Sequence, residues 1–304
     1  MHLSYYYMLY QQKIKSDLLL PEAVSIQPDT QVDIVVELGE PPHWVLEKAK
    51  SGQVDHLEER VMWFYLKGLV LYYVENGNHI IIYRESDRIT DLALRSYLTG
   101  SAMSLAIMQK NYIPLHGGTV AWNGQGIIVS GVSGAGKSTV TMELLKQNFQ
   151  FVADDLSVVD MAEGKAQVFP GFPQQKLCRD VVVKNGLNIE KLIYIDEDRD
   201  KFARILTDGY VTTPIPVASM IELSASNSAS QVEYEVISGG DKYIQLISNM
   251  YRGEVYQRLR NSPERFQLFV RAAASIPMYR ITRPKKGDFV RDIIDCIKEN
   301  ILHI

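Results

Sequence analysis

The chain has 304 residues, with 32 Lys and Arg against 36 Asp and Glu, so its formal net charge at pH 7 is −4. Hydrophobic residues make up 46% and charged residues 22%, which excludes a mostly disordered chain, a collagen-like repeat and a disulfide-rich mini-protein. The acidic balance does not favour nucleic acid as a partner. Cys178 and Cys296 are the two cysteines, and neither lies in a C-x-x-C motif, which indicates a reducing cytoplasm and no structural zinc site. We expect no signal peptide, because the opening residues lack a basic region followed by an apolar stretch. We expect no membrane span, because every apolar run is short.

Residues 1–88 are predicted to form a small β-rich domain. Residues 31–40 alternate apolar and polar side chains, as a half-buried strand does. Aromatic and β-branched runs at 61–74 and 79–85 flank Asn76-Gly77, which is a strong hairpin signal. We expect this part of the chain to form an antiparallel meander.

Residues 89–304 are predicted to form a P-loop catalytic domain of α/β class, with helices packed on a mononucleotide-binding sheet. A helix is expected over 89–109, with Thr90 or Asp91 capping its start. Two strands follow, then a Gly-rich loop, a helix over 139–147 and a strand over 149–160, which is the order of a mononucleotide-binding unit. The later elements are expected to be a helix stopped at Gly186, a hairpin of strands 217–226 and 231–238, helices near 240–252 and 262–274, a strand at 278–284 and a last helix at 288–301.

Residues 131–138 read GVSGAGKS and match the P-loop motif G-x-x-x-x-G-K-[ST] in full. Its glycines let backbone N–H groups turn toward phosphate oxygens, and the helix that follows adds unpaired N–H groups and the positive end of its dipole. Lys137 is expected to reach the β- and γ-phosphates, and the Ser138 hydroxyl to ligate Mg²⁺, so the cofactors are ATP and Mg²⁺. The predicted nucleotide-binding residues are Gly131, Ser133, Gly134, Ala135, Gly136, Lys137, Ser138 and Thr139.

Asp154 and Asp155 follow the apolar run that comes after this helix, at the sheet edge where such folds bind their ligand. We expect one carboxylate to hold Mg²⁺ and the other to polarise an attacking hydroxyl or water. His116 lies 15 residues before Gly131, and a hairpin would bring it back toward the loop. It would bond a catalytic carboxylate there, or else be a structural histidine.

Two groups of basic residues are further candidates for anion binding. Lys201 and Arg204 follow the acidic stretch 196–200, where they would clamp a phosphate or carboxylate, or form local ion pairs at the surface. A second group near the C-terminus would attract an acidic peptide, although a solvated face is the commoner explanation. It consists of Arg271, Arg280, Arg283, Lys285 and Lys286.

The sequences LHGG, GVSGAGKS and FVADD, in this order and spacing, resemble the catalytic domain of HPr kinase/phosphorylase, a family of bacterial P-loop enzymes that phosphorylate a serine on a carrier protein. The resemblance is strongest over residues 112–162. It implies that His116 contacts the catalytic carboxylate, that Asp154 takes the serine proton, and that Asp155 and Ser138 bind Mg²⁺. Lys137 would complete the catalytic set. The family also forms oligomers, so a homo-oligomer is possible.

The segment Ser16–Pro21 reads SDLLLP and resembles the S-D-x-x-L-P of HPr-kinase-like proteins from natural-product clusters, while the E-I-R-G-L-G of true HPr kinases is missing after the Asp pair. Some of those proteins phosphorylate the C-terminal serine of a lasso peptide precursor. The resemblance thus implies an ATP-dependent kinase of a peptide or protein serine. Two alternatives remain at this stage, a nucleotide-gated ATPase switch and a kinase of a small-molecule alcohol.

Overall fold

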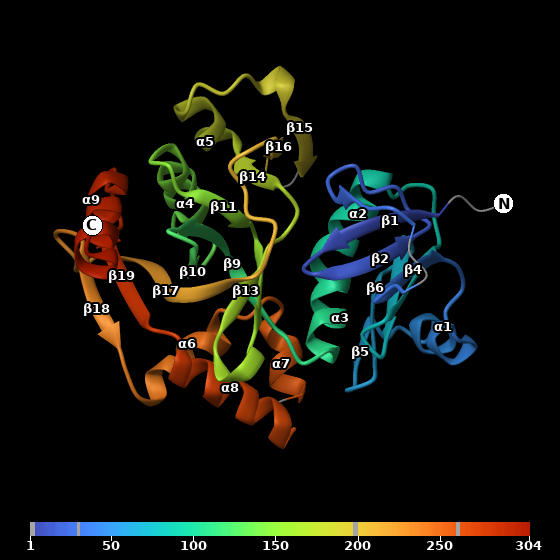
Figure 1. Cartoon of the computed structure of the whole chain (residues 1–304). Coiled ribbons are helices and arrows are strands. Elements are labelled where there is room, and N and C mark those ends of the chain that lie inside the picture. Colours follow the sequence, from blue (N-terminus) through green and yellow to red (C-terminus); the bar gives the residue numbers. More distant parts are fainter. Residues whose placement is uncertain (1–3, 29–30, 197–199, 260–261) are drawn as a thin grey trace.

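The computed structural model describes the whole chain except residues 1–3, 29–30, 197–199 and 260–261. Within the described residues, two eight-stranded sheets and one three-stranded sheet are combined with helices (Figure 1), so the predicted α/β class is confirmed. The first sheet is formed by the blue N-terminal segments in Figure 1, and the other two sheets by the later part of the chain. None of the helices in the described part of the chain is long and apolar enough to cross a membrane.

The first sheet is mixed rather than the expected antiparallel meander, and its strand order is β3-β1-β2-β4-β8-β7-β6-β5. The hairpin at Asn76-Gly77 is confirmed, with φ of 52° and 67° as such a turn requires. The meander prediction was wrong because β4 pairs in parallel with both β2 and β8. Alternating side chains reveal a half-buried strand but carry no information about its direction. The elements are β1 Tyr5–Leu9, β2 Gln12–Ser16, β3 Val24–Ser25, β4 Ile34–Leu38, α1 His43–Lys50, β5 Asp55–Leu57, β6 Val61–Leu66, β7 Val70–Glu75 and β8 His79–Arg84.

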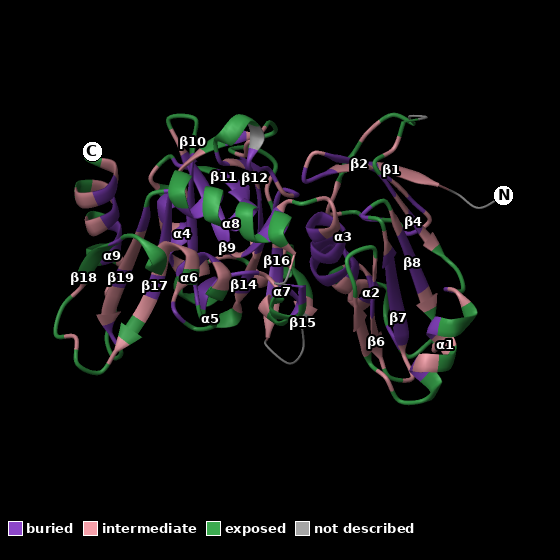
Figure 2. Ribbon diagram, turned by 90° about the horizontal axis from the view of Figure 1, so that it is seen from below, coloured by how far each residue is buried: buried purple, intermediate pink, exposed green. Residues whose placement is uncertain are grey.

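One continuous helical segment follows, made of α2 (Asp91–Tyr97), a π-helical turn (Leu98–Ala102) and α3 (Met103–Gln109). Thr90 caps its start, because its side chain accepts a hydrogen bond from the backbone N–H of Ala93 at 3.2 Å. The segment lies against the first sheet in both ribbon views (Figures 1 and 2), where the Tyr72 hydroxyl donates to the Leu94 carbonyl at 2.8 Å.

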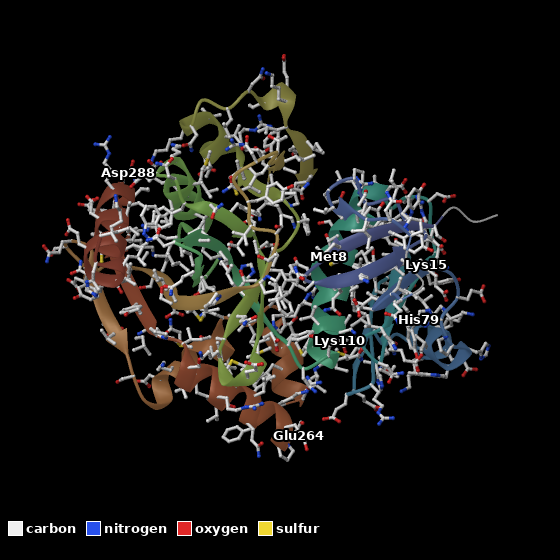
Figure 3. All side chains as sticks on the ribbon, in the orientation of Figure 1. Met8, Lys15, His79, Lys110, Glu264 and Asp288 are labelled. Atoms are coloured by element: carbon white, nitrogen blue, oxygen red, sulfur yellow. The ribbon has the colours of Figure 1, made fainter. Side chains whose placement is uncertain are left out.

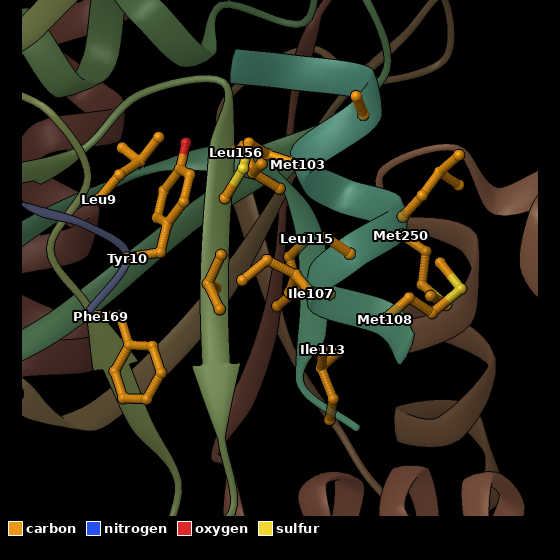
Figure 4. Close-up of a cluster of buried hydrophobic side chains, with 14 of the residues drawn as sticks. Leu9, Tyr10, Met103, Ile107, Met108, Ile113, Leu115, Leu156, Phe169 and Met250 are labelled. Carbon is orange, nitrogen blue, oxygen red and sulfur yellow. The ribbon is translucent and has the colours of Figure 1, made fainter. Parts of the chain in front are cut away.

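A single hydrophobic core joins the first sheet, this helical segment and the second sheet. The close-up in Figure 4 shows Leu9 from the first sheet, Met103 from the helix, and Ile113 and Leu156 from the second sheet. Side chains from both sides fill the seam between the two parts of the molecule (Figure 3). The division of the chain at residues 88/89 stays a prediction, since this core runs across it.

The second sheet has the order β10-β9-β12-β13-β17-β19-β18, with β11 also paired to β9 and β10 also paired to β17. Since β9 is antiparallel to both β10 and β11, the strands on either side of the P-loop helix α4 run parallel with β9 between them. The predicted run 149–160 is divided in two at Asp154-Asp155. The strands and helix are β9 Ile113–Trp122, β10 Gln125–Gly131, α4 Lys137–Lys146, β11 Gln150–Ala153, β12 Leu156–Asp160 and β13 Gln167–Phe169.

The predicted hairpin of 217–226 and 231–238 was wrong. Both strands exist, as β17 (Ile215–Ser226) and β18 (Glu233–Ile237), but β19 (Met278–Pro284) lies between them. A polar connection between two strands does not reveal that a third strand, reached through three helices, separates them. Those helices are α6 Gly240–Ser248, α7 Gly253–Leu259 and α8 Pro263–Ser275, and the chain closes with α9 Val290–Cys296 and a π-helical turn Ile297–Leu302.

The third sheet is small, with the order β14-β16-β15, and it lies beside α4 and above the seam in Figure 1. The segment before Gly186 was expected to be a turn and a helix, and it contains an additional strand, β14. The elements are β14 Gln174–Cys178, α5 Arg179–Lys184, β15 Ile193–Asp196 and β16 Lys201–Ile205.

Candidate active site

The P-loop connects the end of β10 to the start of α4, as the motif predicts. Gly131 has φ of 130°, and a Cβ there would lie 2.3 Å from the carbonyl oxygen of Leu223 on β17. Gly134 and Gly136 also have positive φ, of 80° and 110°, with open space where a side chain would be. The glycines thus serve both the close packing of β10 on β17 and the inward turn of the backbone N–H groups.

Lys137 is folded back on the loop, where its Nζ donates to the carbonyls of Gly131 at 2.7 Å and Val132 at 3.3 Å. Burial lowers the pKa of Lys137, and the nearby charge of Asp155 opposes that shift. Since both partners are backbone carbonyls of the P-loop, the ammonium is held at the loop that is expected to bind phosphates.

Arg283, at the end of β19, also contacts the P-loop. Its Nε donates to the Ala135 carbonyl at 3.3 Å, and a terminal nitrogen lies 3.4 Å from the Gly134 carbonyl. Sequence analysis grouped this arginine with a basic surface. The structure separates it from Arg280, which pairs with Glu222 and Glu235 at 2.7 Å each. A guanidinium therefore stands beside the loop that would hold the nucleotide.

The two aspartates occupy the break between β11 and β12. Asp155 has φ of 65°, a left-handed conformation that aspartate tolerates better than most residues. Asp154 accepts a 2.6 Å hydrogen bond from the backbone N–H of Lys176 on β14. The Nζ of the same lysine lies 3.5 Å from the Asp155 carboxylate. The break in the strand lets two consecutive carboxylates take different partners in one place.

The two carboxyl groups have pKa values shifted in opposite directions. Burial, followed by the charge of Asp155, raises the pKa of Asp154 to about 6. Burial would also raise the pKa of Asp155, but the charges of Lys176, His116 and Lys201 outweigh it and lower that pKa. Opposed shifts of neighbouring carboxyl groups are the usual sign of different chemical roles.

His116 lies beside Asp155, and the contact with the catalytic carboxylate that the resemblance implies stays a prediction. Its Nδ1 lies 3.6 Å from the Asp155 carboxylate. The register of β9 against β12 explains this, because His116 pairs with Leu156, the residue directly after Asp155. The ring of Tyr251 lies beside the histidine ring at a centroid distance of 5.7 Å.

Lys201, at the start of β16, acts on the same group of charges. Its charge acts to lower the pKa values of Asp154, Asp155 and Lys137. Lys137, Lys176 and Lys201 thus place three positive charges near the two aspartates. This excess of positive charge suits the binding of a polyphosphate. Arg204 instead lines a hollow with Asn188 and Lys191.

The acidic stretch before Lys201 forms a local ion pair with Arg179, which is neither of the two basic residues considered from the sequence. The Nε of Arg179 lies 2.6 Å from a carboxylate oxygen of Asp200. Residues 197–199 of that stretch lie outside the described residues.

Tyr10 is a site residue that sequence analysis missed. It lies with Gln11 in the two-residue turn between β1 and β2, and both have positive φ, of 50° and 57°. The Tyr10 side chain is 1% exposed, and its ring lies 3.4 Å from where a Cβ on Gly171 would be. Burial first, then the charges of Tyr251 and the two aspartates, raise its pKa, which places this residue of the first sheet beside the Asp pair. A turn without Gly or Asn gives no sequence signal of such a conformation.

The segment that contains all of these P-loop and aspartate positions matches a known family. Residues 108–190 match the HPr Serine kinase C-terminal domain. Two curated relatives are the HPr kinase/phosphorylases of two strains of Treponema pallidum, one of them strain Nichols, and each is 38% identical to this chain over 80 residues. That alignment covers 24% of this chain and 25% of each relative, so the match spans a quarter of their length.

Among solved structures, the chain is similar to the Hpr(Ser) kinase/phosphatase from Coxiella burnetii, at 12% sequence identity and a TM-score of 0.32. The alignment covers 62% of this chain and 96% of that one.

Proposed function

We propose that this protein is an ATP-dependent kinase that transfers the γ-phosphoryl group to a serine hydroxyl of a peptide or protein. The observation that carries the proposal is the pair Asp154-Asp155 near the P-loop lysine, with carboxyl pKa values shifted in opposite directions. The similarity of residues 108–190 to a serine kinase domain supports the choice of acceptor.

In this proposal the two aspartates have separate roles. Asp154, with its pKa near 6, is ionised at neutral pH and is still basic enough to accept the serine proton. The serine oxygen forms a bond to the γ-phosphorus as the bond to the β,γ-bridging oxygen breaks, ADP leaves, and the proton passes to Asp154. Lys137 and the loop N–H groups stabilise the charge that develops on the phosphoryl oxygens.

The donor set near the P-loop fits Mg²⁺ that is bound together with a nucleotide. No group of three or more His, Cys, Asp or Glu in the described residues could hold a metal ion. Mg²⁺ commonly needs only one or two protein oxygens, because phosphates and waters supply the rest. Asp155, kept ionised by Lys176 and His116, and the Ser138 hydroxyl would hold the ion. When bound, the ion would neutralise charge on the β- and γ-phosphates. His116 would then orient Asp155.

For the substrate we propose the C-terminal serine of a lasso peptide precursor, which rests on the resemblance carried by Ser16–Pro21. The partners would be this peptide and a second copy of the chain in a homo-oligomer, and the location would be the cytoplasm, where ATP is available. No role for nucleic acid or a membrane is part of the proposal.

The test is incubation of the purified chain with γ-labelled ATP, Mg²⁺, HPr and serine-ended peptides taken from neighbouring genes. Label on a peptide serine, lost in Lys137→Ala, is the expected result. Asp154→Asn should lower the rate of transfer by about 10²–10⁴-fold and keep nucleotide binding, so transfer at the wild-type rate by that variant would refute the role of Asp154. Release of free phosphate without labelled peptide would support the ATPase switch instead, and label on an alcohol without any peptide would support a small-molecule kinase.

A further inference from the structure

A pocket lies at the seam between the first sheet and the small third sheet, next to the Asp pair. It is a small hollow of about 70 Å³, partly open to solvent, which is below the range of sites that enclose a whole small ligand and suits one side chain of a larger molecule. Its walls come from three segments, namely the loop after β2 with Glu22, the helix α2 with Arg95 and Ser96, and the strands of the third sheet with Lys176. None of the P-loop residues described here lines it, so the pocket is separate from the nucleotide site.

Lys176 connects the pocket to the two carboxylates. It lines the pocket, its backbone N–H donates to Asp154 at 2.6 Å, and its Nζ lies 3.5 Å from Asp155. Lys176 therefore lies between the pocket and the Asp pair. The charges of the two aspartates also act on the pKa of Lys137 in the P-loop. A phosphoryl transfer needs the acceptor hydroxyl and the leaving oxygen on opposite sides of the transferred group, with the base beside the acceptor, and a pocket next to Asp154 but apart from the P-loop suits an acceptor.

The polar wall of the pocket has spare hydrogen-bonding capacity. The Nε of Arg95 is buried without a hydrogen-bond partner among the described residues, although the Glu22 carboxylate is 3.3 Å away in an ion pair. Glu22 supplies an acceptor in poor alignment, so a better-aligned acceptor would improve the hydrogen bonding of this buried nitrogen. A peptide carbonyl or carboxylate in the pocket would do so.

The sequence SDLLLP builds the wall that carries Glu22. The Ser16 hydroxyl bonds both the N–H and the carbonyl of Leu18, and the Tyr7 hydroxyl accepts from the N–H of Leu20 at 2.8 Å. Leu18 and Leu20 are buried beneath this turn. The motif thus folds the loop tightly against the first sheet and presents the residues after it to the pocket.

Another wall is apolar and belongs to the third sheet. Ile193 on β15 and Ile205 on β16 are 43% and 47% exposed, which leaves apolar surface that a side chain of a partner can cover. β14 and β15 are the two edges of the third sheet, and an extended peptide can pair with such an edge.

We propose that this pocket binds the acceptor, an extended peptide with an apolar side chain beside its serine. The apolar side chain of the peptide would pack on Ile193 and Ile205, and a carbonyl of the peptide backbone would accept a hydrogen bond from Arg95. The serine hydroxyl would lie next to Lys176, within reach of the Asp154 carboxylate. The inference rests on the proposed kinase function and adds to it the location and the preference of the acceptor site.

The experiment measures transfer from γ-labelled ATP to two sets of synthetic serine-ended heptapeptides, one with leucine before the serine and one with aspartate there. Ser96→Trp places a large side chain at the exposed mouth of the pocket, and Ile205→Asp makes the apolar wall acidic. The wild-type chain should prefer the leucine set by about tenfold in kcat/KM. Both variants should raise the KM for that set by about tenfold, while binding of a fluorescent ATP analogue stays within about twofold.

Ile244→Gln is the matched control, because Ile244 on α6 is 63% exposed and lies outside this pocket. It should leave both kinetic constants and the melting temperature unchanged. Wild-type kcat/KM in folded Ser96→Trp and Ile205→Asp would overturn the pocket and leave the kinase function standing. If the wild-type chain binds the ATP analogue but labels neither set nor any other peptide, the kinase function itself fails, and the pocket proposal fails with it.

Discussion

Asp154→Asn should make the protein inactive and at the same time more stable. Burial and the charge of Asp155 raise the pKa of Asp154 to about 6, which means that the folded protein holds this carboxylate in an unfavourable state at neutral pH. Asparagine keeps the shape and can still accept the 2.6 Å hydrogen bond from the Lys176 N–H. It carries no charge and cannot take the serine proton, so the rate of transfer should fall by about 10²–10⁴-fold.

The magnitude of the stabilisation follows from the pKa shift. A rise from the ordinary value of 3.8 to about 6 corresponds to at most about 3 kcal/mol, at 1.36 kcal/mol for each unit. Because solvent reaches part of this half-buried side chain, we expect about 1–2 kcal/mol. Between pH 4 and 6 the folded wild-type protein binds more protons than the unfolded chain, so its stability falls as the pH rises. The gain in the variant should therefore be near zero at pH 4 and complete above about pH 6.

Urea unfolding from pH 4 to 8, in EDTA and without nucleotide, measures this difference. The control is Asp155→Asn, for which we expect the opposite sign. The charges of Lys176 and His116 help to lower the pKa of Asp155, so its ionised form stabilises the fold above the unfolded pKa, and that contribution is lost as the pH falls through the folded pKa. The reasoning is refuted if both variants change stability in the same direction at pH 8, or if Asp154→Asn unfolds more easily there.

Three further substitutions test individual parts of the site. Gly131→Ala should destabilise the protein by more than about 1 kcal/mol in urea unfolding, because the added Cβ would meet the Leu223 carbonyl at 2.3 Å and the φ of 130° disfavours any side chain. Lys137→Met should lower kcat by about 10³-fold without loss of thermal stability, since burial already disfavours the ammonium, and a clear fall in melting temperature would contradict this. His116→Ala should raise the Mg²⁺ concentration needed for half-maximal activity by about 10–100-fold, measured by Mg²⁺ titration, because the histidine holds Asp155.

The parts of the site that could be predicted from the sequence are those encoded by local geometry. The P-loop needs glycines at fixed spacing between a strand and a helix, and Gly131, Gly134 and Gly136 have the expected positive φ. The Asn76-Gly77 turn and the Thr90 cap are local in the same sense.

The parts that could not be predicted depend on which strands become neighbours. The contact of His116 with Asp155 follows from the register of β9 on β12, and no pattern within either strand specifies that register. Lys176 reaches both aspartates from β14, a strand that lies in a segment rich in Pro and Gly and lacks clear alternation. The separation of β17 from β18 by β19 has the same origin.

The position of Tyr10 bears on how the two parts of the chain work together. Two consecutive residues other than Gly or Asn in left-handed conformations are costly, so the β1–β2 turn must be held in place by its surroundings. Those surroundings are two connections next to the second sheet, since Tyr10 is buried against Gly171, between β13 and β14, and Gln11 donates to the Thr212 carbonyl at 3.4 Å, between β16 and β17. The turn is therefore shaped by the part of the molecule that carries the P-loop and the Asp pair. It follows that the first sheet helps to build the site beside Asp154, in addition to any contact it makes with an acceptor.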